Sequence, residues 1–288
     1  MKKLLILLLG LVIMLSGCGP KVDEETKELN RIIDRFIEVY ADDYIKLGDA
    51  PVLHENVIAA IKALDDYGMD ISLNDYLSKE EVKEYYDELD YTSIAVAYKA
   101  IVISKAFEVT HEKATTYLES LTEVDVDIWS YTYGIIALRL ANVNSALENA
   151  LLGKINIIRE EDFRDADYAG YALIASSGKT LDRAPLYTLI NDNLTETGVN
   201  FYGSANSAAT ASVILGLIAD GKNPISEEYT TNGVNLVDAL LGFEVDGAFK
   251  NTFEESEVDL GFSTPQAFSA IVSYKLFKEG KSANILLP

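Results

Sequence analysis

Apolar residues recur along this chain in two alternating helical patterns. In the first pattern, apolar side chains occupy nearly every position of a segment that ends at a glycine or a small polar residue. A helix that is hydrophobic all round is buried on all sides. The sequence predicts six such helices, at residues 56–67, 91–104, 128–140, 166–177, 206–220 and 265–279.

The second pattern is amphipathic, with an apolar stripe and a charged face. Such helices suit an outer layer, because one face packs inward and the other meets water. The sequence predicts five of them between the buried helices and one before the first, at residues 79–89, 112–121, 143–152, 183–194, 231–242 and 24–46.

Residues at the helix ends support this alternation. Glycines that can adopt a positive φ end four of the buried helices. Residues with side chains that cap helices, or that favour a first turn, precede four of them. The terminating glycines are Gly68, Gly178, Gly221 and Gly280, and the residues at the starts are Asp127, Asp165, Ser204 and Thr264. The stops recur at an interval of about one helical hairpin, so we interpret the chain as an internal repeat.

These elements predict an all-α fold, an α/α toroid of about six helical hairpins that spans residues 24–288. The alternative is an open solenoid of the same hairpins. The helix at 24–46 favours closure, because it is amphipathic and otherwise has no partner. A segment at 243–262 interrupts the last repeat. Gly247 and Gly261 near its ends would allow it to hinge as a lid.

Part of the chain resembles a known superfamily. The segments Asn206–Leu217, Gly233–Phe249 and Ser263–Val272 are similar to the repeats of the protein prenyltransferase and squalene–hopene cyclase superfamily. The resemblance implies the toroid more than any activity. A prenyltransferase zinc site needs Asp, Cys and His, and the chain has only His54 and His111 and one cysteine. The cyclase Asp-x-Asp-Asp acid is incomplete here, because Ile128 follows Asp127.

The first eighteen residues form a secretory signal. Met1–Lys3 is basic, Leu4–Leu15 is an apolar run interrupted by Gly10, and Leu-Ser-Gly precedes Cys18. This ending resembles the lipobox of bacterial lipoproteins. It implies a signal peptide at 1–17, a lipidated Cys18 with a spacer to residue 23, and a protein anchored on the extracytoplasmic face of a cell membrane. An ordinary membrane helix is the alternative, but the apolar run is shorter than the ~20 residues that a span needs.

Composition narrows the partners. The net charge is −22 with 49% hydrophobic residues, so nucleic acid is an unfavourable partner and a sizeable core is expected. Cys18 is the only cysteine, so we expect no disulfide and no cysteine-based metal site. The acidic run Glu160–Asp162 lacks the spacing of a known calcium loop, and we expect no metal and no cofactor.

Candidate binding residues lie where the buried helices begin. In a toroid these ends surround one mouth of the central cavity, where free N–H groups favour polar ligand atoms. Aromatic, carboxylate and amide side chains there suit sugars, peptides or amines, although each also has a plain role in packing or capping. The candidates are Trp129, Tyr131, Asp167, Tyr168, Tyr202, Asn206 and Gln266.

The leading hypothesis is that the toroid binds an extracellular small molecule, glycan or protein partner without catalysis. A competing hypothesis is a carbohydrate-active hydrolase or lyase of the cell envelope, with Asp127, Asp167 or Glu244 as catalytic residues. Hydrolysis requires two carboxyl groups about 5 or 6.5–9.5 Å apart. A third hypothesis is an interaction module whose acidic outer face docks a cationic partner, with binding that weakens as salt increases.

Overall fold

The protein is mainly helical in the computed structural model, which describes residues 23–127, 130–143, 145–155 and 165–287. These residues form 13 α-helices and nine strands of two to four residues. The prediction of a helical fold is confirmed, with the correction that short β-hairpins join several helices. The signal segment, Cys18, Trp129 and Glu160–Asp162 lie outside the described residues.

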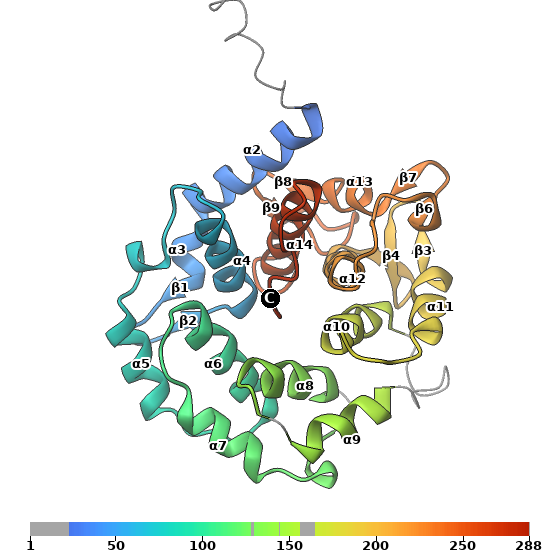
Figure 1. Cartoon of the computed structure of the whole chain (residues 1–288). Coiled ribbons are helices and arrows are strands. Elements are labelled where there is room, and N and C mark those ends of the chain that lie inside the picture. Colours follow the sequence, from blue (N-terminus) through green and yellow to red (C-terminus); the bar gives the residue numbers. More distant parts are fainter. Residues whose placement is uncertain (1–22, 128–129, 144, 156–164, 288) are drawn as a thin grey trace, which may run out of the picture.

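Six helices form a cycle of contacts. Each one contacts the next along the chain, and the last contacts the first. Figure 1 shows them around the middle of the view. We call them the central helices: α4 (Glu55–Asp66), α6 (Ile94–Ala106), α8 (Tyr131–Leu140), α10 (Ala166–Ser176), α12 (Ser207–Ala219) and α14 (Ser263–Lys278). Nearly all of their apolar side chains are buried, as the continuous hydrophobic pattern predicts.

The remaining helices lie farther out in Figure 1 and contact the central helices. Their exposed faces carry the charged residues, which is why their sequences alternate between apolar and polar positions. They are α2 (Glu24–Val39), α3 (Ala41–Tyr44), α5 (Lys79–Glu88), α7 (Glu112–Ser120), α9 (Ala146–Ile155), α11 (Ala184–Asp192) and α13 (Leu236–Leu241).

Nine strands pair as antiparallel hairpins or as a three-stranded meander. They are β1 (Ile45–Lys46), β2 (Val52–Leu53), β3 (Leu194–Thr195), β4 (Gly198–Phe201), β5 (Ser204–Asn206), β6 (Thr230–Thr231), β7 (Val234–Asn235), β8 (Glu244–Val245) and β9 (Ala248–Phe249). The hairpin turns at 202–203, 232–233 and 246–247 each have two residues with positive φ. This geometry matches the two-residue turn that Asn-Gly and Asp-Gly favour.

Two predicted amphipathic helices need correction. The segment 24–46 contains two helices, α2 and α3, and ends in strand β1. The segment 231–242 begins as hairpin β6–β7 and becomes helical only at Leu236. Asn232-Gly233 forms the turn of this hairpin with φ values of 52° and 87°, which a helix does not allow.

The central helices end in one recurring way. Four end at the predicted glycines, which all have positive φ. In α6 and α8, Glu108 and Asn142 take the same left-handed position instead, with φ of 57° and 55°. The stops predicted near Lys105 and Ala141 are confirmed to within one residue, since α6 ends at Ala106 and α8 ends at Leu140. Backbone bonds such as Val109 N to Ser104 O and Val143 N to Leu138 O close these ends.

The helix starts differ in part from the predicted caps. Helix α12 is capped by Asn206, whose Oδ1 accepts a hydrogen bond from Ala209 N at 2.9 Å, and Ser204 lies in strand β5. Helix α14 begins at Ser263, one residue before Thr264. Asp127 accepts a hydrogen bond from Ser130 N, and α8 begins only at Tyr131.

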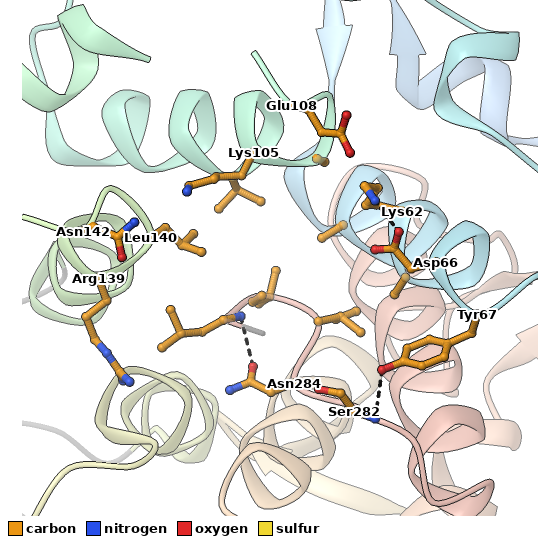
Figure 2. A pocket seen from close by; sticks show the side chains of 17 residues that line it. Lys62, Asp66, Tyr67, Lys105, Glu108, Arg139, Leu140, Asn142, Ser282 and Asn284 are labelled. Atoms are coloured by element: carbon orange, nitrogen blue, oxygen red, sulfur yellow. Dashed lines mark hydrogen bonds and ion pairs between the residues drawn. The ribbon is translucent and has the colours of Figure 1, made fainter. Parts of the chain in front are cut away.

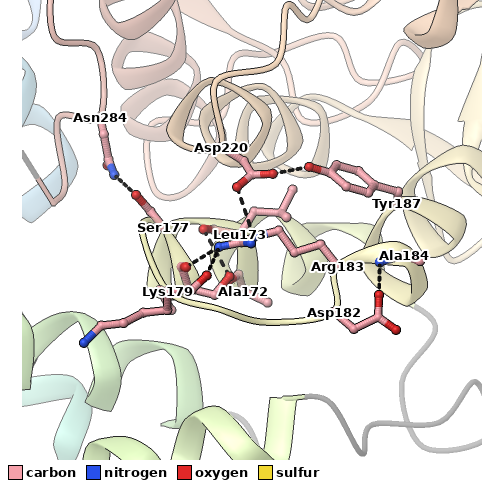
Figure 3. A network of polar contacts seen from close by, with 12 residues as sticks. Ala172, Leu173, Ser177, Lys179, Asp182, Arg183, Ala184, Tyr187, Asp220 and Asn284 are labelled. Carbon is pink, nitrogen blue, oxygen red and sulfur yellow. Dashed lines mark hydrogen bonds and ion pairs between the residues drawn. The ribbon is translucent and has the colours of Figure 1, made fainter.

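Helices α10 and α12 approach at backbone distance. A Cβ atom placed on Gly170 would lie 2.2 Å from Ser212 O, and one on Gly216 would lie 2.4 Å from Gly170 O. Only glycine fits at these two positions, because even a methyl group would overlap the opposing backbone. At the carboxyl ends of the same helices, Arg183 donates to the carbonyls of Ser176 and Lys179 and pairs with Asp220 at 3.0 Å (Figure 3).

The segment 243–262 is tied to the central helices. Ser207 N donates to Asn251 O, and Phe249 N donates to Thr264 Oγ1. Asp259 accepts hydrogen bonds from the backbone of Gly261, Phe262 and Ser263. These bonds hold both ends of the segment against the beginnings of α12 and α14.

Candidate functional site

The carboxyl ends of three central helices line one cavity, so these helices run in the same direction. Their amino ends therefore lie together at the opposite end of the molecule. The beginnings of α12 and α14 also lie side by side. Asn206, the cap of α12, donates to Asn251 Oδ1 at 2.6 Å, and Ser263 of α14 donates to the same oxygen. We call this region the amino-terminal end.

Tyrosines fill the space behind the amino-terminal end. The rings of Tyr98 and Tyr133 stack with centroids 4.8 Å apart, and Tyr171 meets Tyr133 edge-on at 5.3 Å. Tyr98 and Tyr171 are buried, and Asn56 makes a side-chain hydrogen bond to Tyr171. Burial raises the pKa of both phenols well above its ordinary value. The packed rings fill the interior at this level of the molecule, and the raised pKa keeps the phenols of Tyr98 and Tyr171 neutral.

Two carboxyl groups flank this tyrosine cluster. Burial raises the pKa of Asp167 to about 6, and the nearby charge of Asp165 adds to the shift, although Tyr168 N donates to Asp167 Oδ1 at 2.7 Å. Glu55 is buried near His54 and Lys99, each 3.7 Å away. Burial raises the pKa of Tyr133 to about 12, and the charges of Glu55 and Asp167 contribute. The Tyr133 phenol therefore interacts electrostatically with both carboxylates.

The predicted binding residues differ in their exposure and in what they contact. Tyr202 is exposed by 80% at the turn between β4 and β5, and its hydroxyl donates to Asp165 Oδ2 at 3.3 Å. Tyr168 is buried, and Tyr131 lies under the Lys154 ammonium at 5.4 Å. Asn206 caps α12, and Gln266 accepts a hydrogen bond from Ser212 at 3.2 Å. Asn206 and Gln266 thus join neighbouring segments, which is the structural role that the sequence left open.

The three predicted catalytic carboxylates do not form one cluster. Glu244 lies in β8, where it pairs with Arg31 of α2 at 2.8 Å and accepts a bond from Gly247 N. Asp127 is exposed and binds Ser130. Of the three, only Asp167 is half-buried close to the tyrosines, where its charge acts on Tyr133 and Tyr171. No contact among the described residues joins it to the other two.

Exposed apolar side chains gather in the segments that lead into the central helices. The three most exposed large apolar residues of the described chain are Val124, Tyr202 and Phe262, at 91%, 80% and 72%. They precede α8, α12 and α14 respectively. Leu260, at 42%, lies beside Phe262. Tyr202 was predicted from the sequence, but Phe262 and Val124 were not, because both lie outside the periodic helices, where the hydrophobic pattern does not indicate burial or exposure.

A cavity of about 460 Å³ lies at the opposite end of the molecule. It is enclosed by the carboxyl ends of α4, α6 and α8 and by residues 282–287, as Figure 2 shows. Ser282 N donates to the Tyr67 hydroxyl at 3.1 Å, and Leu286 is buried. This cavity could not be predicted from the sequence, because no predicted element covers the residues after Gly280.

The described residues contain no group of three or more side chains placed to hold a metal ion. None of the helices in the described ranges has the length and hydrophobicity needed to cross a bilayer. No known protein family and no curated protein matches this chain.

Proposed function

We propose that this chain is a lipid-anchored binding protein of the extracytoplasmic membrane face, with the architecture of an α/α toroid. The closed cycle of helix contacts supports the toroid over an open array, in which the first and last repeats would not meet. The lipobox-like Leu-Ser-Gly-Cys sequence supports the anchor at Cys18. Two or more acyl chains on that residue would hold the protein stably on a bilayer.

The binding face in this proposal is the amino-terminal end. The observation that carries it is the exposure of Tyr202 and Phe262 there, at 80% and 72%. Contiguous exposed apolar patches mark interaction surfaces, and Phe262 is close in sequence to another exposed apolar residue, Leu260, at 42%. The stacked tyrosines close the interior behind this face, so a ligand would lie across the surface. Aromatic faces stack against the C–H groups of sugar rings, and the negative charge of the protein disfavours an anionic chain. We therefore propose a neutral or cationic glycan as the ligand.

The experiment measures sedimentation of the purified protein with insoluble neutral and cationic polysaccharides. In the double variant Tyr202→Ala, Phe262→Ala we expect affinity to fall roughly tenfold, since one aromatic contact contributes about 0.5–1.5 kcal/mol. Tyr67→Ala is the matched control, because Tyr67 is also an exposed aromatic residue, at 37%, but lies after the carboxyl end of α4, opposite the proposed face. Equal binding by the double variant and the control would overturn the proposed face.

The anchor is tested separately. Metabolic labelling with an alkyne fatty acid should mark the wild-type protein, and Cys18→Ser should lose both the label and the membrane association. Retention of the variant in the membrane fraction would contradict the lipid anchor and leave the glycan proposal standing.

One observation favours a second candidate function, a carbohydrate-active enzyme. The pKa of about 6 makes Asp167 a carboxyl group that is still partly protonated in mildly acidic medium, as a general acid requires. Glycan turnover that disappears in Asp167→Asn would support catalysis. Turnover that is unchanged in this variant would exclude Asp167 as the acid.

A further inference from the structure

We infer that the cavity between α4, α6, α8 and residues 282–287 binds a small amphipathic monocarboxylate. This site is distinct from the amino-terminal end and does not depend on the proposed glycan binding. Its volume of about 460 Å³ lies within the range of about 300–1,000 Å³ that is usual for small-molecule sites.

The cavity wall is largely apolar. It is formed by small side chains of α4 and α6 and by three aliphatic residues after α14, of which Leu286 is 1% exposed. Such a wall suits a hydrocarbon body, because burial of apolar surface contributes about 25 cal/mol per Å². The apolar lining consists of Ala59, Ala63, Val102, Ala106, Leu140, Ile285, Leu286 and Leu287.

The acidic residues that line the cavity are all paired with lysines, whereas two of its basic residues are not paired with any acid in the described segments. Asp66 is paired with Lys62 from its own helix, and Glu108 is paired with Lys79 of α5. Both acidic groups are thus neutralised by lysines. The two remaining cations, Lys105 and Arg139, have no ion pair among the described residues.

Lys105 and Arg139 come from the last turns of the neighbouring helices α6 and α8 (Figure 2). Arg139 Nη1 donates to Ala175 O at 2.8 Å, which holds its guanidinium and leaves its other N–H groups available. The negative charge of Glu148 interacts with the Arg139 guanidinium, but Glu148 is already paired with Lys179 at 2.7 Å. Lys105 is exposed and has no bonded partner in the described part of the chain.

Helix ends account for part of this arrangement, because carboxyl-terminal dipoles stabilise cations in a last turn. They do not account for the apolar space that the two cations border. In a chain of net charge −22, this is a local exception to the acidic field. The planar guanidinium matches a carboxylate, and the ammonium adds a second donor. A carboxylate with a hydrocarbon body satisfies both the cations and the wall.

The experiment uses three probes of the same length and different head groups: decanoate, decanol and decylammonium. Isothermal titration on the whole protein should show that decanoate binds most tightly. Lys105→Met should weaken decanoate roughly tenfold, since a hydrogen bond to a charged group contributes about 1.5–3 kcal/mol. Lys222→Met is the matched control, because Lys222 also has no ion pair with any residue that the structure describes, but it lies over the Tyr187 ring at 5.2 Å, outside the cavity.

Since Lys105 has no bonded partner within the described ranges, its replacement should leave the melting temperature unchanged, and a melting curve checks this. Arg139→Lys, which keeps the charge and loses the planar fork, should weaken decanoate less than Lys105→Met weakens it. The inference is overturned if decanoate does not bind, if decylammonium binds as tightly, or if Lys105→Met binds decanoate like the control.

Discussion

The six central helices can be divided into a first half, α4, α6 and α8, and a second half, α10, α12 and α14. The two halves are packed by different means. Between α10 and α12, Gly170 and Gly216 bring the two backbones into direct contact. Between α6 and α8, large rings such as Tyr98 and Tyr133 fill the space, and the cavity opens at the carboxyl ends of α4, α6 and α8. Glycine contacts leave no room for a ligand and tolerate no added atom. Larger side chains fill space less completely and can change rotamer. A cavity can therefore form in the first half, where such side chains separate the helices.

The largest expected effect breaks the glycine contact. Gly170→Ala should destabilise the protein by about 3 kcal/mol or more, because its Cβ would overlap the backbone of Ser212 at 2.2 Å and two helices would have to separate. The matched test in the first half is Gly134→Ala. Its Cβ would meet a rotatable group, Leu151 Cδ1, at 3.1 Å.

Alanine also favours a helix over glycine by about 1 kcal/mol, so Gly134→Ala should stay within about 1 kcal/mol of the wild type. Denaturant unfolding of both variants provides the measurement. Similar losses at the two sites would contradict the difference between the halves.

A smaller effect concerns the arginines at the carboxyl ends. Arg183 joins α10 to α12 through two carbonyls and Asp220, and Tyr187 also donates to Asp220. Arg183→Met should cost about 2 kcal/mol, because it leaves Asp220 partly buried without its cation. Arg139→Met in the first half loses one bond to Ala175 O and should cost about 1 kcal/mol. Thermal unfolding in moderate salt compares them, and a larger loss at Arg139 would reverse the ranking.

The third effect is a gain in stability. The pKa of Asp167 is raised to about 6 in the folded protein, against an ordinary 3.8, so the folded state binds more protons between these values. The free energy of unfolding from this group therefore falls as the pH rises from about 4 to about 6. Asp167→Asn should remove this slope and be more stable at pH 7 by about 1–2 kcal/mol. Parallel stability curves for the two proteins between pH 4 and 7 would contradict the shift.

The six central helices could be predicted to within a few residues because their sequences are apolar all round and their stops are mostly glycines. The hairpins were missed although Asn232-Gly233 and Asp246-Gly247 indicate tight turns. Strands of two residues are too short to show an alternating pattern. The ends of α6 and α8 were also predicted to within one residue, although Glu108 and Asn142 adopt there a conformation that glycine usually takes.

The candidate site was less predictable than the helices. Position in the repeat correctly placed Tyr202, Asp167 and Asn206 near helix starts, because capping and burial are local properties. It also selected Glu244, which belongs to a hairpin held by Arg31 from the start of the chain. The partners of Glu244 and the lining of the cavity depend on contacts between distant segments, which a single sequence does not reveal.

Helix α14 contacts α4 and α2, so the contacts among the six central helices have no terminal member. Ser269 donates to Asn56 O across 213 positions, and the Phe36 and Phe268 rings stack 3.8 Å apart. In a linear repeat array, unfolding can begin at a terminal unit that has one neighbour. Here every central helix has two neighbours, so we expect a single cooperative unfolding transition. Folding should be slow for a helical protein, because these long-range contacts must close the chain before they contribute stability.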